Sequence, residues 1–138
     1  MTYLIDTNII TEILKGNEVV EKKAIRKILE GNRVLINGIS YYEIKRGLLA
    51  SNAANKLKKF EMLWKTFGLL LLDNKDIFDR ASRIYAGLKK NGKLISDADI
   101  LIASMAFCQN CTLVSNDTDF ERIEDLKLEN WITNCEKN

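Results

Sequence analysis

Short apolar runs alternate along the chain with segments in which apolar residues recur at helical spacing. Runs with the length of a β-strand lie at 2–5, 33–37, 69–72, 112–115 and, as an edge strand, 126–131. Helical patterns lie at 9–14, 19–29, 40–50, 53–67, 76–90 and 96–108, with a further short helix at 116–120. Strands that alternate with helices pair in parallel and are covered by those helices. The pattern therefore predicts an α/β sandwich around a parallel sheet.

Two of the helical patterns differ in their apolar faces. The segment 96–108 is apolar almost all round, which is typical of a helix buried on every side. The segment 53–67 carries Leu57, Phe60, Trp64 and Phe67 on one side and most of its lysines elsewhere. We therefore expect the first helix to lie centrally and the second to pack one face on the core.

Length and composition indicate an ordinary globular protein. The chain has 138 residues, enough for one domain with a real core, and 46% of them are apolar and 29% charged. No basic leader precedes a long apolar run, so the sequence predicts neither a signal peptide nor a membrane span. We expect a cytoplasmic protein.

The chain has three cysteines, Cys108, Cys111 and Cys135. The first two form a C-x-x-C pair, but at the end of a helical pattern, whereas a redox pair needs the helix N-terminus to lower its thiol pKa. The chain has no histidine to complete a zinc site with them. We expect the cysteines to be small, buried apolar residues.

Four acidic residues lie where predicted strands give way to helices, or in the first turn of a helix: Asp6, Glu43, Asp99 and Asp117. The carboxyl ends of parallel strands meet at one edge of a sheet, so the fold brings these acids together. Clustered carboxylates repel one another and raise each other's pKa, which favours a bound cation. Oxygen ligands without histidine suit Mg²⁺ or Mn²⁺.

Each acid taken alone also fits a helix cap. Glu43 and Asp99 follow Ser40 and Ser96 at capping-box spacing, and the other two acids fit plain N-caps. Asp119 fits either a second ligand or a solvated turn residue. Nearby polar residues are expected to orient the ligands, to bind a phosphate or to cap helices: Thr7, Asn8, Asp97, Ser115 and Asn116.

The net charge gains meaning once the four acids are set aside. The whole chain carries 21 cationic and 19 acidic residues, a net +2, and the remainder without these acids carries +6. A basic exterior around an acidic site suits a polyanionic substrate. An ordinary solvated surface is the alternative that charge alone leaves open.

Four motifs occur in order along the chain: LIDTNII, ISYYEIKRG, ISDADILIASMA and TLVSNDTDFERI, with LKLENW near the end. Together they resemble the PIN-domain ribonucleases, and more narrowly the VapC-type toxins of bacterial toxin–antitoxin pairs. The resemblance spans nearly the whole chain. It implies a single PIN domain over residues 1–138, with a PIN-like three-layer α/β/α sandwich and a parallel, roughly five-stranded sheet.

The same resemblance implies a metal-dependent endoribonuclease. Asp6, Glu43, Asp99 and Asp117 match the family's catalytic acids, and Asp6, Asp99, Asp117 and Asp119 are the implied metal ligands. Family members differ in whether they use the position of Asp117 or Asp119. The implied cofactor is Mg²⁺, or Mn²⁺, and the implied substrate is structured RNA, notably tRNA. We expect metal-assisted hydrolysis to leave 5′-phosphate and 3′-hydroxyl ends.

The implied assembly is a homodimer neutralised by a VapB-like antitoxin, which also links the complex to operator DNA. For RNA binding the candidates are Lys45, Arg46, Lys56 and Lys59, with Lys58, Lys89, Lys90 and Lys93 as further ones. Trp64 and Phe67 are core residues by default and otherwise line a groove for the antitoxin helix. A non-catalytic PIN-like binding domain and a DNA-directed nuclease are the alternative functions.

Overall fold

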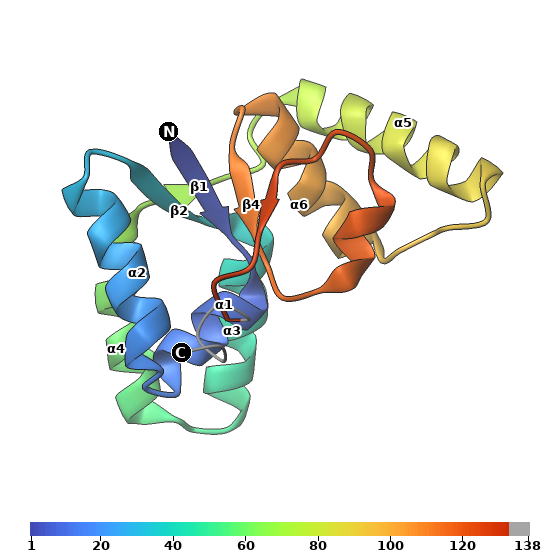
Figure 1. The fold of residues 1–138 in the computed structure, drawn as a ribbon. Helices are drawn as coiled ribbons and strands as arrows, with labels where there is room; N and C mark the ends of the chain where they lie inside the picture. Colours follow the sequence, from blue (N-terminus) through green and yellow to red (C-terminus); the bar gives the residue numbers. More distant parts are fainter. Residues whose placement is uncertain (133–138) are drawn as a thin grey trace.

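The computed structural model describes residues 1–132 and shows a parallel sheet between two layers of helices (Figure 1). The strand order is β3-β2-β1-β4-β5. The central strand β1 (Thr2–Ile5) pairs in parallel with β2 (Arg33–Asn37) and with β4 (Thr112–Val114). The outer strands are β3 (Leu69–Leu70) and β5 (Leu128–Glu129). The predicted α/β/α sandwich with a five-stranded parallel sheet is confirmed.

The helices divide between the two faces of the sheet. One core contains buried residues of α1 (Thr7–Leu14), α2 (Glu18–Leu29) and α4 (Ala54–Phe67), and the other contains those of α5 (Lys75–Lys90) and α6 (Asp97–Cys108). Alternation along β1 explains the division, because Tyr3 and Ile5 join the first core and Leu4 joins the second. Helix α3 (Gly38–Ala50) follows β2 and packs against α1 and α4.

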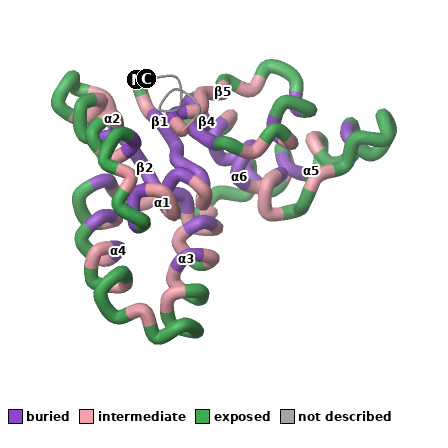
Figure 2. Tube along the Cα trace, turned by 60° about the horizontal axis from the view of Figure 1, so that its bottom comes forward, coloured by how far each residue is buried: buried purple, intermediate pink, exposed green. Residues whose placement is uncertain are grey.

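The middle of helix α6 is deeply buried, as its apolar sequence predicts. Ile100 and the residues from Ile102 to Ala106 are all buried, and α5 packs along it as an outer layer. Figure 2 shows buried positions concentrated on the strands and α6, while much of α5 is exposed. The first turn of α6 is thereby held at the carboxyl edge of the sheet.

Several predicted boundaries are wrong in detail. The runs at 69–72 and 126–131 contribute only two strand residues each. Strand β4 ends at Val114, one residue earlier than predicted, although the Ser115 amide still donates to the Glu129 carbonyl at 3.0 Å. Edge strands have one pairing neighbour, so a long apolar run does not fix their length. The short helix expected at 116–120 is a 3₁₀ helix, η1, at Thr118–Arg122.

The capping box predicted at Ser40 is also wrong. Helix α3 begins earlier, at Gly38, and Asn37 is its N-cap, with Oδ1 accepting the Ser40 backbone amide at 2.8 Å. Ser96 does cap α6, since its Oγ accepts the Asp99 amide at 3.2 Å. The local spacing identified one cap of two because a buried asparagine competes with the serine.

The cysteine prediction holds for one of the two described residues. Cys111 is buried, but Cys108 is exposed at the end of α6, and Cys135 lies outside the described residues. Within residues 1–132, no helix is both long and apolar enough to cross a bilayer. The expectation of one domain over all 138 residues extends beyond the described part and stays a prediction.

Candidate active site

A cleft of about 520 Å³ opens at the carboxyl end of the sheet. The four predicted acids line it, from the end of β1, from α3, from the start of α6 and from the loop after β4: Asp6, Glu43, Asp99 and Asp117. Thr7, Asn8 and Asn116 also line it, and Lys15 is the cation in its wall. The fold thus brings together carboxylates that are far apart in sequence. Their catalytic roles stay predictions.

Asp6 lies at the N-cap position of α1, but its carboxylate makes no capping hydrogen bond. Its Oδ2 instead accepts from Ser115 Oγ at 2.8 Å and from Asn8 Nδ2 at 3.2 Å. The residue is only 5% exposed, and this burial raises its pKa above the usual range. The Thr7 backbone and the Ser115 hydroxyl partly offset that rise in pKa. The cap interpretation therefore fails for Asp6, which presents a costly buried charge to the cleft.

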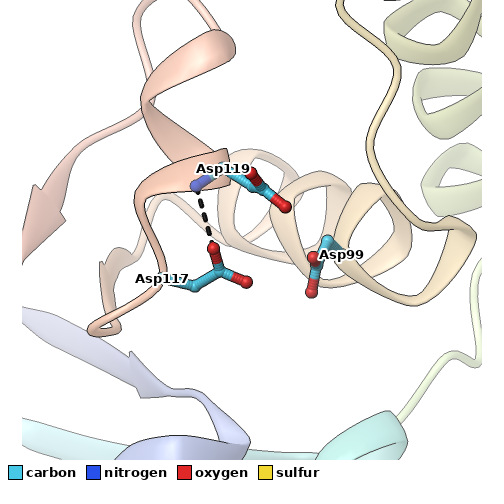
Figure 3. Close-up of side chains that lie close together, drawn as sticks. All are labelled: Asp99, Asp117 and Asp119. Atoms are coloured by element: carbon cyan, nitrogen blue, oxygen red, sulfur yellow. Dashed lines mark hydrogen bonds between the residues drawn. The ribbon is translucent and has the colours of Figure 1, made fainter.

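Asp99, Asp117 and Asp119 form a compact cluster, in which one carboxylate oxygen of each lies within 4.8 Å of the others (Figure 3). Asp117 is also a cap, because its Oδ1 accepts the Asp119 amide at 2.9 Å. Cap and ligand are thus compatible, since Asp117 keeps a second oxygen. Three converging carboxylates are the donor set that hard cations such as Mg²⁺ prefer, so these residues fit the implied metal.

The electrostatics of the cluster are most visible at Asp99. The pKa of this carboxyl is raised to about 6, mainly because the residue is buried. The Ser96 hydroxyl opposes this shift, and the negative charges of Asp6, Asp117 and Asp119 contribute to it. Ionising Asp99 beside these charges is therefore unfavourable until a positive charge enters the cleft.

Glu43 is held by a chain of hydrogen bonds that the sequence does not reveal. Its Oε1 lies 2.7 Å from the Thr7 hydroxyl, which lies 2.9 Å from Ser40 Oγ. A hydroxyl has one hydrogen, so Thr7 donates to the carboxylate and accepts from Ser40. The Asn37 amide donates to Ser40 Oγ at 2.9 Å. Asn37 and Ser40 are fully buried. The one feature of the sequence that could have indicated them is an asparagine at the end of an apolar strand.

The other polar candidates divide between the cleft and a separate surface. Asn8 Oδ1 accepts the Asn116 backbone amide at 3.0 Å, and Ser115 Oγ accepts the Asp117 amide at 3.0 Å. These bonds fix the loop after β4 against α1. Asp97 is exposed and lines another depression, together with residues of α5, so it does not face the cleft.

The predicted RNA-binding cations lie outside the cleft lining. Lys45 pairs with Glu61 at 3.0 Å, and Lys59 donates to the Ile13 carbonyl at 2.9 Å. The Arg46 guanidinium lies 5.0 Å from the centre of the Tyr42 ring, and Lys56 is exposed. These side chains are engaged on the α3–α4 side of the molecule or free at its surface. Their role in RNA binding stays a prediction.

The predicted antitoxin groove finds mixed support in the positions of its two residues. Phe67 is only 7% exposed and belongs to the core, so it offers almost no surface to a partner in this structure. Trp64 is half-buried, and its Nε1 donates to Glu61 Oε2 at 3.0 Å. Only Trp64 is therefore placed to contribute to such a groove.

The metal-free protein is expected to be more stable at about pH 5 than at about pH 7.5. The folded state binds the Asp99 proton more tightly than the unfolded state, because the pKa rises from 3.8 to about 6. Ionisation of Asp99 therefore lowers the stability of the fold progressively as pH rises from about 4 to about 6, and the whole loss is present above about pH 6. Thermal unfolding in EDTA measures the difference in Tm.

Two variants show whether Asp99 causes this pH dependence. Asp99→Asn removes the titrating group and should shrink the Tm difference, whereas Asp73→Asn, an exposed change of the same charge, should leave it intact. An equal Tm at both pH values in the unaltered protein would contradict the prediction.

Comparison with known proteins shows consistent similarity. The PIN domain family model matches residues 3–126. The chain is 29% identical over 133 residues to Ribonuclease VapC1 of Haemophilus influenzae strain R2866, and 30% identical over 139 residues to Ribonuclease VapC2 of Rickettsia felis. Each match covers 95% of this chain and 98% of the relative. The fold is similar to the crystal structure of VapBC2 from Rickettsia felis bound to a DNA fragment from their promoter, with a TM-score of 0.87, 25% identity and coverage of 95% and 99%.

Proposed function

We propose that this chain, which belongs to the PIN domain family, is a metal-dependent endoribonuclease toxin that hydrolyses phosphodiester bonds in structured RNA. The observation that carries the proposal is the convergence of Asp6, Glu43, Asp99 and Asp117 on one cleft. The relatives named as ribonucleases support RNA as the substrate, since they match this chain over nearly its whole length.

The acidic cluster is the proposed cofactor site. Asp99, Asp117 and Asp119 would hold Mg²⁺ or Mn²⁺, and Asp6 would add its charge from the floor of the cleft. When bound, the cation supplies Lewis-acid chemistry by polarising phosphate oxygens and making water more acidic. The buried charge of Asp6 favours a cation in the cleft because no ion pair within residues 1–132 neutralises it.

Glu43 is the proposed acceptor of the proton from the attacking water. The Thr7 hydroxyl holds its Oε1, which leaves Oε2 to take the proton. Attack forms a new phosphorus–oxygen bond and breaks the bond to the 3′-oxygen, which takes up a proton from solvent water. The products therefore carry 5′-phosphate and 3′-hydroxyl ends. The Asn37–Ser40–Thr7 chain keeps Glu43 oriented during this step.

We further propose tRNA as the structured substrate and a VapB-like antitoxin as the inhibitor. The Rickettsia felis structure supports an antitoxin partner, because it is a VapBC2 complex, and its bound promoter DNA supports a link to operator DNA. By analogy, this protein would act in the cytoplasm as a homodimer and would reach operator DNA through its antitoxin.

Cleavage of matched RNA and DNA oligonucleotides in Mg²⁺ tests the proposed activity. We expect internal cleavage of RNA with 5′-phosphate ends, and cleavage of DNA of the same sequence at least about tenfold more slowly, because the 2′-hydroxyl contributes to recognition. End-labelled substrates and gel mapping measure both results. RNA that is bound but not cut would favour a non-catalytic domain, and equal cutting of DNA would favour a DNA-directed nuclease.

A further inference from the structure

A second hollow, of about 530 Å³, lies between α5, the end of α6 and the segment after η1. Figure 1 shows α5 and α6 side by side on the face of the sheet opposite α2 and α4. We call it the basic hollow because its lining includes four cationic side chains: Arg80, Arg83, Lys93 and Arg122. Two acids, Glu121 and Glu124, also line it, and its floor is partly apolar.

Three of these cations are available to bind an anion. Arg80, Arg83 and Lys93 are exposed, and none forms an ion pair with another residue of 1–132. Arg83 lies on α5 and Lys93 on the loop that follows it, so two elements supply these charges to the lining of the hollow. Cations without an internal ion pair are free to neutralise nucleic-acid phosphates and release the counterions condensed on them.

The floor of the basic hollow has the chemistry of a base-stacking platform. The Arg80 guanidinium lies 4.5 Å from the centre of the Phe107 ring, and Ile84 and Ile123 also line the hollow. Aromatic rings and guanidinium planes stack on unpaired nucleobases, whereas an acidic peptide has no need of such a surface. Glu121 and Glu124 can accept hydrogen bonds from the amino groups of bases.

Arg122 connects the basic hollow to the acidic cluster. It follows Asp119 by one turn of η1, and its Nη2 lies 3.6 Å from Asp119 Oδ1. Its Nη1 donates to the Leu94 carbonyl at 3.0 Å, which ties η1 to the loop after α5. The acidic cluster and the basic hollow are therefore neighbours, because η1 supplies Asp119 to the first and Arg122 to the second.

We propose that the basic hollow binds unpaired nucleotides of the RNA that adjoin the scissile phosphodiester. The inference rests on the proposed function, because it assumes that the acidic cluster cuts RNA. It places substrate binding on α5, η1 and Lys93, which was one of the further candidates from the sequence, rather than on Lys45, Arg46, Lys56 and Lys59 of α3 and α4.

Paired variants with the same loss of charge test the proposal. Arg80→Gln/Arg83→Gln alters the hollow, and Lys22→Gln/Arg26→Gln alters exposed cations of α2 in the opposite helical layer. Binding of a fluorescent single-stranded RNA of about 12 nucleotides is measured in an Asp6→Asn background across a salt series. Cleavage kinetics of the same RNA are measured in the background that keeps Asp6.

The hollow variant is expected to weaken RNA binding about tenfold or more and to flatten the salt slope by about 1.4, while the α2 variant changes neither. In the cleavage assay KM should rise and kcat should change little. RNA that is cut with equal KM in both variants would refute the hollow and leave the proposed function standing. RNA that binds through the hollow but is never cut would refute the proposed function and leave the hollow as a binding site. Tighter binding of an acidic peptide than of RNA, lost in the hollow variant, would make the surface a protein-docking site instead.

Discussion

Asp6→Asn is expected to lower the rate of RNA cleavage on the order of 100- to 1,000-fold without unfolding the protein. Asparagine keeps an oxygen that can accept from Ser115, so that hydrogen bond survives. It removes the negative charge that Asp6 contributes to the floor of the cleft. Single-turnover cleavage of RNA in Mg²⁺, alongside thermal unfolding, measures both consequences.

The stability of the same variant distinguishes a charged site residue from a structural cap. Burial raises the pKa of Asp6, so its ionised form opposes folding at neutral pH. The Tm of Asp6→Asn in EDTA should therefore equal or exceed that of the unaltered protein. Asp73→Asn, exposed and far along the chain, provides the control for loss of one carboxylate. A lowered Tm with normal cleavage would mean that Asp6 is only structural.

Removing divalent cations with EDTA is expected to reduce cleavage by at least about 1,000-fold, and added Mg²⁺ or Mn²⁺ should restore it. The reason is electrostatic as well as chemical, since the carboxylates of Asp99, Asp117 and Asp119 and the charge of Asp6 would otherwise repel the phosphate. Cleavage that proceeds undiminished in EDTA, or that yields cyclic phosphates, would overturn the proposed chemistry.

A Mg²⁺ titration of activity also decides between Asp117 and Asp119. Asp117→Asn should raise the Mg²⁺ concentration for half-maximal cleavage about tenfold or more, and Asp119→Asn should raise it less. Asp117 lines the cleft and acts electrostatically on both Asp6 and Asp99. Arg122 offsets part of the Asp119 charge at 3.6 Å. Asparagine still caps η1, so the first variant separates charge from capping.

The fold was largely predictable because its signals are periodic and topological. The strand at 2–5 and the apolar helix at 97–108 are visible as patterns, and the parallel arrangement then places Asp6 and Asp99 at one edge. Local sequence patterns such as helix caps predicted the structure less well. Ser40 has the spacing of a helix cap, yet Asn37 at the end of β2 caps α3 instead, and both residues are buried.

The parts of the site that depend on side-chain contacts were not predictable. Nothing in the spacing of Thr7 and Glu43 shows that they lie 2.7 Å apart, because the contact joins two helices across the sheet edge. The arginines of the basic hollow were missed for a similar reason, although Lys93 in its lining was among the further RNA-binding candidates. The arginines are divided between α5 and η1, and no run of cations in the sequence marks them.

The hydrogen bonds of Asn37 also bear on how the protein ages chemically. Asn37 precedes Gly38, and asparagine–glycine sequences deamidate readily in flexible chains. Here the amide donates to the Ile5 carbonyl at 3.1 Å and to Ser40 Oγ at 2.9 Å, and its Oδ1 accepts the Ser40 amide. The folded state thus shields a labile bond, and unfolding exposes it. Conversion to aspartate would replace a donor with an acceptor opposite Ser40, so deamidation of the unfolded chain would leave a lasting lesion beside Glu43 after refolding.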